Sequence, residues 1–159
     1  LSGCGTLGAP ADAVVISGRF SGRISRDGRT QSASGRYRLT QTRKADVLEL
    51  LTPLYGVLGR VTVSSAGAVL ERGSQPPVEA PSAEALMQEA FGFALPVPML
   101  KSWLVAGRPA ASAASRTISP ESFEQAGWRV TVRRRLADGS PAVLALSGGG
   151  ISLSLTIEP

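Results

Sequence analysis

Few side chains in this sequence are suited to acid–base, nucleophilic or metal chemistry. The 159 residues include no histidine and a single cysteine, Cys4. Without imidazole there is no Ser-His-Asp or Cys-His nucleophile, no histidine metal site and no ordinary general base near neutral pH. One cysteine excludes an intrachain disulfide and any zinc or iron–sulfur site built from several thiolates. Catalysis would have to use the 12 carboxylates, the lysines or hydroxyl groups, so we expect a protein that is not an enzyme and uses no cofactor or metal.

The cationic side chains are almost all arginines. Lys44 and Lys101 are the only lysines among 17 basic residues, and the formal net charge is +5. Because arginine binds phosphate well, nucleic acid, anionic lipid headgroups and an acidic protein surface are all candidate partners. A coding bias toward arginine explains the same composition equally well. Nucleic-acid binding would need aromatic side chains interleaved with exposed arginines, and only Tyr37, between Arg36 and Arg38, has that setting. We therefore expect no nucleic-acid partner.

The first residues, Leu1-Ser2-Gly3-Cys4-Gly5, resemble a bacterial lipobox. This resemblance implies that residues 1–3 are a remnant of a signal peptide, that Cys4 carries the lipid, and that residues 4–13 form a flexible tether. A lone buried cysteine is the alternative reading. No run of 18 apolar residues follows, so the sequence predicts no transmembrane helix and attachment by the anchor alone. Gly5 stands where an aspartate retains enteric-type lipoproteins at the inner membrane, which implies the outer membrane.

The hydrophobic pattern predicts a mainly β domain over residues 14–159. Apolar and polar residues alternate with a period of two in many short segments, separated by Asp-Gly and Gly-rich turns. The predicted strands cover residues 16–25, 33–40, 47–51, 57–64, 68–72, 122–125, 128–133, 142–146 and 151–157. Loops are expected at 73–81 and 108–119. Two short helices, Ala83 to Phe91 after Ser82 and Pro98 to Gly107, interrupt the strands. This order predicts a strongly curved sheet or half-open antiparallel barrel with a helical lid.

The inward face of the predicted sheet holds small residues where a packed barrel needs large ones. They are Gly18, Gly22, Ala33, Gly35 and Gly59. Such a face can enclose a hydrophobic cavity, and flexible methionines and wide aromatic rings suit acyl chains of no fixed shape. The candidate cavity and lid residues are Phe20, Tyr37, Leu86, Met87, Phe91, Met99, Leu100 and Trp103. The alternative is that these are ordinary core residues and that the glycines mark bulges or curvature.

Several blocks of the sequence, taken in order, resemble one known family. The segment from Leu95 to Pro109, with Leu95-Pro96-Val97 and Trp103, looks like the LP(V/I)…L…W…G.P signature of the outer-membrane lipoprotein receptor family LolB. Ser17 to Phe20 resembles its first-strand G-R-[FL], Thr52-Pro53-Leu54 its N/T-P-L loop, Phe123 to Trp128 its Q-x-G-W turn, and Leu144 to Leu155 its closing hairpin. The resemblance covers about Val15 to Ile157.

The resemblance implies a fold and a function. In that family an incomplete barrel with a helical lid takes acylated lipoproteins from a soluble periplasmic carrier of the same fold, which is LolA-like. It then inserts them into the outer-membrane lipid of a Gram-negative bacterium, while itself being anchored on the periplasmic face. The family's membrane-inserting leucine corresponds to Leu54, flanked here by Pro53 and Tyr55. We expect a monomer and non-covalent, downhill transfer.

The sequence also departs from the family pattern. The segment before the first strand is short, Tyr55 interrupts the Pro-Leu-Gly run, and tryptophans common in the family are absent around Tyr37 and Glu158. The alternative function is a lipoprotein of the same fold that serves as a structural or partner-docking module and moves no lipid. A large dry cavity would speak against this alternative, and a filled core would support it.

Overall fold

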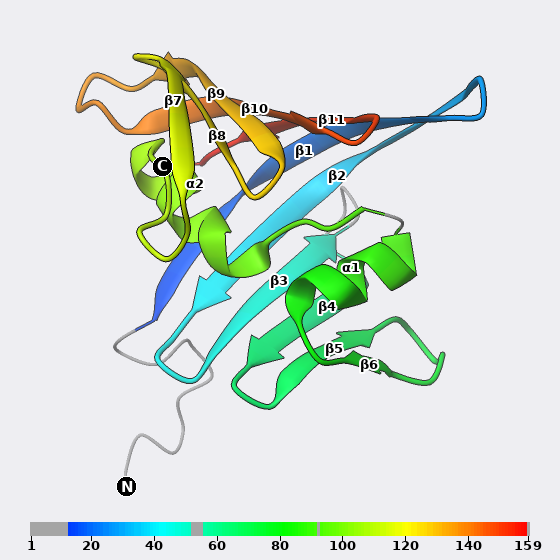
Figure 1. The fold of residues 1–159 in the computed structure, drawn as a ribbon. Helices are drawn as coiled ribbons and strands as arrows, with labels where there is room; N and C mark the ends of the chain where they lie inside the picture. Colours follow the sequence, from blue (N-terminus) through cyan, green and yellow to red (C-terminus); the bar gives the residue numbers. More distant parts are fainter. Residues whose placement is uncertain (1–12, 52–55, 92, 159) are drawn as a thin grey trace, which may run out of the picture.

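The computed structural model describes residues 13–51, 56–91 and 93–158. Within them, antiparallel strands form one sheet in the order β6-β5-β4-β3-β2-β1-β11-β10-β9-β8-β7 (Figure 1). The strands are β1 (Val14–Arg26), β2 (Arg29–Gln41), β3 (Ala45–Leu51), β4 (Val57–Ser64), β5 (Gly67–Glu71), β6 (Val78–Ala80), β7 (Ser115–Ser119), β8 (Ser122–Gln125), β9 (Trp128–Arg135), β10 (Pro141–Gly148) and β11 (Ile151–Thr156). The helical elements are α1 (Ala83–Phe91), a 3₁₀ turn η1 (Val97–Met99) and α2 (Leu100–Ala106).

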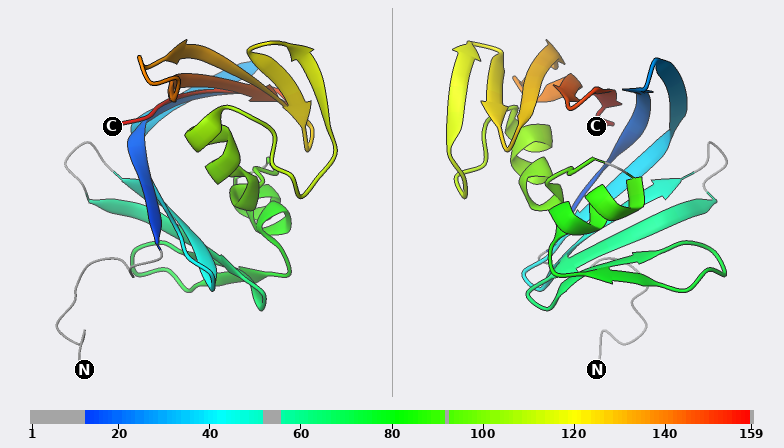
Figure 2. Two further views of the ribbon diagram at one scale, coloured as in Figure 1. Left: turned by 90° about the vertical axis from the view of Figure 1, so that its left-hand side faces the viewer. Right: turned by 45° about the vertical axis from the view of Figure 1, so that its right-hand side comes forward.

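The sheet curves around the two helices (Figure 2). Its edge strands, β6 and β7, do not pair with each other among the described residues, so the barrel is open along one side. The helices pack inside this curve, where their apolar side chains join the inward residues of the strands in one core. The predicted half-open barrel with a helical lid is confirmed.

The long β1–β2 hairpin follows from its local sequence. The two strands pair without a shift from Val14 opposite Gln41 to Arg26 opposite Arg29. Asp27 and Gly28 form the turn with φ of 51° and 74°, and Asp-Gly is the dipeptide that best accommodates two such residues. β11 then pairs with β1, from Phe20 opposite Leu155 to Ile24 opposite Ile151, so the first and last strands lie side by side in the middle of the sheet.

The expectation of loops at 73–81 and 108–119 was wrong in part. β6 and β7 lie within these segments and form the two edges of the sheet. Every residue of β7 is exposed, so it has no apolar alternation from which a strand could be predicted. Its backbone is extended because it pairs with β8, from Ser115 opposite Gln125 to Ser119 opposite Ser122.

The helix boundaries agree with the capping residues in part. Ser82 Oγ accepts a hydrogen bond from the Ala85 N–H at 3.1 Å, as expected for an N-cap of α1. Gly107 ends α2 with φ of 66°, and its N–H donates to the Trp103 carbonyl at 2.9 Å. The second helix does not begin at Pro98, since the chain first makes the 3₁₀ turn η1 and becomes α-helical at Leu100.

Gly18 is required where β1 passes close to the end of β11. A Cβ at this position would overlap the carbonyl oxygen of Thr156. The same carbonyl accepts a hydrogen bond from the Tyr37 hydroxyl at 2.8 Å, and the Tyr37 side chain is buried. Burial, and secondarily the charge of Glu158, raises the pKa of Tyr37 far above its ordinary value, so the hydroxyl stays a donor.

Replacing Tyr37 with phenylalanine tests this contact. The variant Tyr37→Phe keeps the ring in the core but removes the donor to Thr156, so we expect a loss of about 1 kcal/mol in the free energy of unfolding. Urea denaturation of the two proteins measures the difference. An unchanged midpoint and slope would show that the hydrogen bond contributes nothing net to stability.

Candidate functional site: an apolar cavity under the helices

An apolar cavity lies between the helices and the inward face of the sheet. Its volume is about 100 Å³. The side chains around it come from strands of both halves of the sheet and from the helical segment between β6 and β7. They are Phe20, Tyr37, Leu48, Leu50, Met87, Phe93, Leu95, Leu100, Leu104, Leu146, Leu153 and Leu155. Tyr37 is the only one with a polar atom, and its hydroxyl is bound to Thr156.

A second, larger cavity of about 340 Å³ adjoins the first. The two share Phe20, Leu50, Phe93 and Leu153, and we call the larger one the mouth of the cavity. Leu58, with 53% of its surface exposed, and Val57, with 49%, lie at the start of β4, and Leu58 lines the mouth. Of the residues that the structure describes, Arg23 and Arg72 are the only charged ones that line it.

The small inward residues divide into two groups. Gly22, Ala33 and Gly59 line the mouth. A Cβ on Gly59 would lie 3.6 Å from the nearest Arg72 atom, so part of the missing side-chain volume is open space, whereas a Cβ on Gly22 would lie 2.6 Å from Leu153 Cδ2. Gly18 and Gly35 instead allow close packing, since a Cβ on Gly35 would lie 2.6 Å from the Leu51 carbonyl oxygen. The two interpretations of the small residues, open space for a cavity and close packing of the backbone, therefore apply at different positions.

The structure brings some of the sequence-predicted residues to the cavity and not others. Phe20, Tyr37, Met87 and Leu100 line it. Leu86 and Trp103 are fully buried in the core without lining the cavity or its mouth, and Met99 packs half-buried against the core. The side chain of Phe91 and residues Cys4, Pro53, Leu54 and Tyr55 lie outside what the structure describes.

Sequence reasoning missed most of the leucines that line the cavity. Leu48, Leu50, Leu153 and Leu155 occupy inward positions of strands that the alternation did identify. Alternation tells which residues share a face, but not which strands meet across the barrel. The pairing of β11 with β1 is what places Leu153 and Leu155 beside Phe20.

A buried glutamine holds α2 and the following loop against β8. Gln125 Oε1 accepts hydrogen bonds from Trp103 Nε1 at 2.9 Å and from the Ala110 N–H at 2.8 Å. Its Nε2 donates to the carbonyls of Ala110, at 2.7 Å, and Ala113, at 3.0 Å. All four hydrogen-bonding positions of this amide are thus used. The Trp103 ring also packs edge to face on Phe123, with centroids 6.2 Å apart.

The segment between the helices has a similar anchor. Trp128 Nε1 donates to the Ala94 carbonyl at 3.0 Å, and the Trp128 ring packs edge to face on Phe93, with centroids 6.1 Å apart. Gln125 and Trp128, which hold α2 and the segment between the helices, therefore both belong to the β8–β9 hairpin. They are part of the turn that resembles the Q-x-G-W turn of the LolB family.

No charged residue in the described part of the chain lines the smaller apolar cavity, although Arg23 and Arg72 line its mouth. Glu124 accepts from Arg116 and from Arg129 at the surface, and these two arginines, Arg116 first, hold the pKa of Glu124 below its ordinary value. Among the described residues no group of acidic or cysteine side chains could hold a metal ion. No helix in the described ranges is long and apolar enough to cross a membrane. The site offers an apolar surface that can hold hydrocarbon.

Comparisons with known proteins agree with this geometry. A family model described as "Outer membrane lipoprotein LolB" matches residues 18–158. The chain is 44% identical over 131 residues to the outer-membrane lipoprotein LolB of Ralstonia nicotianae, covering 79% of this chain and 62% of that protein. It is 39% identical over 118 residues to the LolB of Cupriavidus necator, covering 71% and 59%. It is 29% identical over 171 residues to the LolB of Thiobacillus denitrificans, covering 99% and 90%.

The first two matches span only about six-tenths of those relatives' own length. Among solved structures, a LolA superfamily protein from Nitrosomonas europaea has a TM-score of 0.49 and 9% identity, over 95% of this chain and 86% of that one. The family model covers nearly the whole described region, and relatives above 30% identity cover more than two thirds of the chain. The chain therefore belongs to the LolB family of outer membrane lipoproteins.

Proposed function

We propose that this chain is an outer-membrane-anchored receptor, facing the periplasm, that accepts acylated lipoproteins from a LolA-like carrier and inserts them into the outer membrane. The observation that supports this most directly is the apolar cavity with its mouth beneath two helices. A module that only docked a partner would need no such cavity. Transfer is non-covalent, because burial of hydrocarbon supplies the driving force.

The helices must move for an acyl chain to enter. The cavity of about 100 Å³ is smaller than the pockets that hold drug-sized ligands, which are roughly 300–1,000 Å³. α2 is tied to β8 through Trp103 and Gln125. α1 contacts the core through apolar side chains, among them Leu86 and Met87, and such contacts can slide without breaking hydrogen bonds. We infer that α1 is displaced while α2 stays on the sheet.

The proposed insertion device is the connection between β3 and β4. Leu51 pairs with Val57 across these strands, so the Pro53-Leu54-Tyr55 segment joins two paired strand ends. Val57 and Leu58, both about half exposed, lie at the start of β4, and Leu58 lines the mouth. Burying Leu54 in lipid would contribute about 1.5–3 kcal/mol, and a tyrosine beside it suits the headgroup level. We further propose that Cys4 carries the anchoring lipid.

Depletion of the protein from its native cell, followed by replacement with Leu54→Glu, tests this function. A carboxylate at position 54 makes bilayer entry costly, so we expect a reporter lipoprotein to accumulate on the carrier or in the periplasm instead of the outer-membrane fraction. Fractionation of inner membrane, outer membrane and periplasm measures the distribution.

Leu136→Glu is the matched control, because Leu136 is an exposed leucine (39%) in the turn between β9 and β10. It should restore normal sorting. Normal sorting under depletion, or with Leu54→Glu, would contradict the receptor function and favour the partner-docking alternative.

A further inference from the structure

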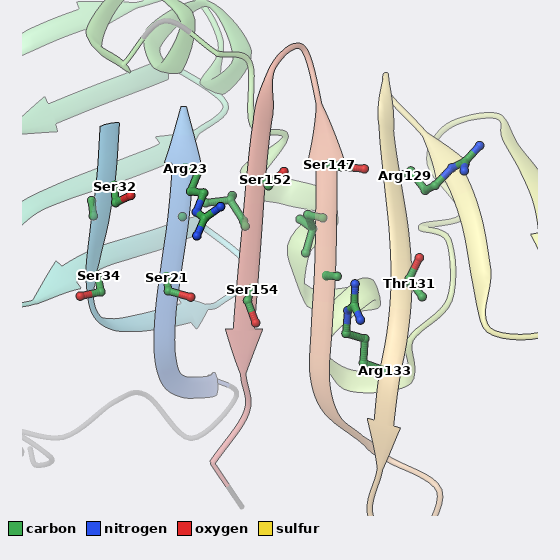
Figure 3. A pocket seen from close by; sticks show the side chains of 15 residues that line it. Ser21, Arg23, Ser32, Ser34, Arg129, Thr131, Arg133, Ser147, Ser152 and Ser154 are labelled. Carbon is green, nitrogen blue, oxygen red and sulfur yellow. The ribbon is translucent and has the colours of Figure 1, made fainter. Parts of the chain in front are cut away.

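The outer face of the sheet, on the side away from the helices, carries a polar trough. It has a volume of about 1000 Å³ and spans strands β2, β1, β11, β10 and β9 (Figure 3). Six of its lining residues are serines, one is Thr131, and three are the arginines Arg23, Arg129 and Arg133. None of the described residues that line it is acidic or aromatic.

The strand register arranges these side chains in two rows. One row runs Ser34, Ser21, Ser154, Ala145 and Thr131, and the next runs Ser32, Arg23, Ser152, Ser147 and Arg129. Neighbouring strands lie about 4.8 Å apart, so from β1 to β9 the trough is roughly 14 Å wide. The floor of the trough, on β11 and β10, has short side chains. Arginine side chains project from β1 on one side of the floor and from β9 on the other (Figure 3).

The positive charge of the trough is only partly compensated. Arg129 donates to Glu124 at 3.1 Å, but that carboxylate also binds Arg116. Among the described residues, neither Arg23 nor Arg133 has a carboxylate within ion-pair distance. Several arginines facing one groove repel one another, and a bound anion would relieve this repulsion.

The chemistry of the lining distinguishes between classes of partner. Protein interfaces are enriched in aromatic residues and arginine and depleted in serine. The trough has the arginines, but its lining is rich in serine and holds no aromatic side chain among the described residues. Binding of single-stranded nucleic acid uses aromatic stacking, which the lining does not offer. Arginines and a floor of hydroxyl groups instead match phosphates that carry glycerol hydroxyls, because guanidinium binds phosphate strongly and serine both donates and accepts.

We propose that the trough is a docking surface for a bilayer of anionic phospholipids and takes their glycerophosphate headgroups. The trough and the mouth of the cavity share Gly22, Arg23 and Ser32 on β1 and β2, so a bilayer docked here lies beside the mouth. The proposal does not depend on acyl transfer, because the headgroups would contact the face of the sheet opposite the cavity.

Vesicle sedimentation tests the docking surface. The probe is the 159-residue chain with Cys4→Ser, which removes any acyl anchor. Vesicles contain either phosphatidylcholine alone or equal parts of phosphatidylcholine and phosphatidylglycerol, and we expect binding to the second kind only. The triple variant Arg23→Gln, Arg129→Gln, Arg133→Gln should bind about a hundredfold more weakly, at roughly fivefold for each arginine near an anionic surface.

A second triple variant, Lys44→Gln, Arg108→Gln, Arg134→Gln, is the matched control. It lowers the formal net charge by the same amount, from +5 to +2, at exposed positions outside the trough. It should bind nearly as the parent chain does. Ser152→Glu, which places one carboxylate on the floor, should abolish binding without removing an arginine. Thermal unfolding of each variant checks that the fold is retained.

Three results would overturn the proposal. Equal losses in the two triple variants would mean that net charge alone drives binding. Unchanged vesicle binding in the trough triple variant and in Ser152→Glu would show that the trough does not contact the bilayer. An acidic protein would then be the remaining candidate partner of the trough. Displacement of the chain from vesicles by stoichiometric free glycerol phosphate would identify a site for a small anion rather than a bilayer surface.

Discussion

A glutamate in place of Leu50 is expected to abolish acyl-chain binding. Leu50 lines both the apolar cavity and its mouth, so an acyl chain that occupies the two would contact it. The Leu50→Glu carboxylate would have to lose water against hydrocarbon, a cost of several kcal/mol that corresponds to at least a hundredfold loss in affinity. Titration of the purified chain with a fluorescent fatty acid measures the effect.

Two controls separate the cavity from the rest of the molecule. Leu50→Met conserves volume and apolarity, so it should bind the fluorescent chain nearly as the parent does. Val15→Glu introduces the same carboxylate on the outward side of β1, where Val15 is 51% exposed, and should leave binding intact. Retained binding in Leu50→Glu, with a normal thermal transition, would exclude this cavity as the acyl site.

Gln125→Leu is expected to have the largest effect on stability. The substitution leaves the Trp103 and Ala110 N–H groups and the Ala110 and Ala113 carbonyls without their partner. Each buried unsatisfied group costs roughly 1–3 kcal/mol, so even partial relaxation should leave a loss of about 3 kcal/mol. For a chain of this size, that loss lowers the Tm by about 6–12 °C.

Differential scanning calorimetry measures this change, and Gln88→Leu is its control. Gln88 lies on the exposed side of α1, so its replacement should change stability by less than about 0.5 kcal/mol. A Tm for Gln125→Leu within the range of the control would mean that α2 is held by packing alone. In that case the inference that α2 stays on the sheet while α1 moves would lose its support.

Local patterns in the sequence were sufficient to predict most of the elements. Alternation with Asp-Gly or Gly-rich turns predicted the β1–β2 and β10–β11 hairpins, and Ser82 and Gly107 correctly predicted one end of each helix. These features depend on residues within a few positions of one another. The edge strands β6 and β7 escaped prediction because pairing with a neighbour, not their own side chains, makes them extended.

The candidate site depended on contacts that no local pattern contains. The alternating pattern predicted that Phe20 and Tyr37 face inward. It missed the leucines of the cavity wall, because the sequence does not indicate which strands face each other across the barrel. Gln125 lies in a segment that resembles the LolB family. No residue near it in the sequence indicates that its hydrogen-bond partner would be Trp103, 22 positions away.

The sequence by itself therefore determined the periodicity, the turns and the helix caps, together with a family resemblance that the comparisons confirm. The tertiary structure alone decided where the cavity lies, which arginines face one trough, and which side chains hold the helices. The physical reason is the separation along the sequence of the residues that interact. Backbone geometry and alternation act between adjacent residues, whereas the cavity and the trough both arise from pairing of β1 with β11, strands separated by more than a hundred residues.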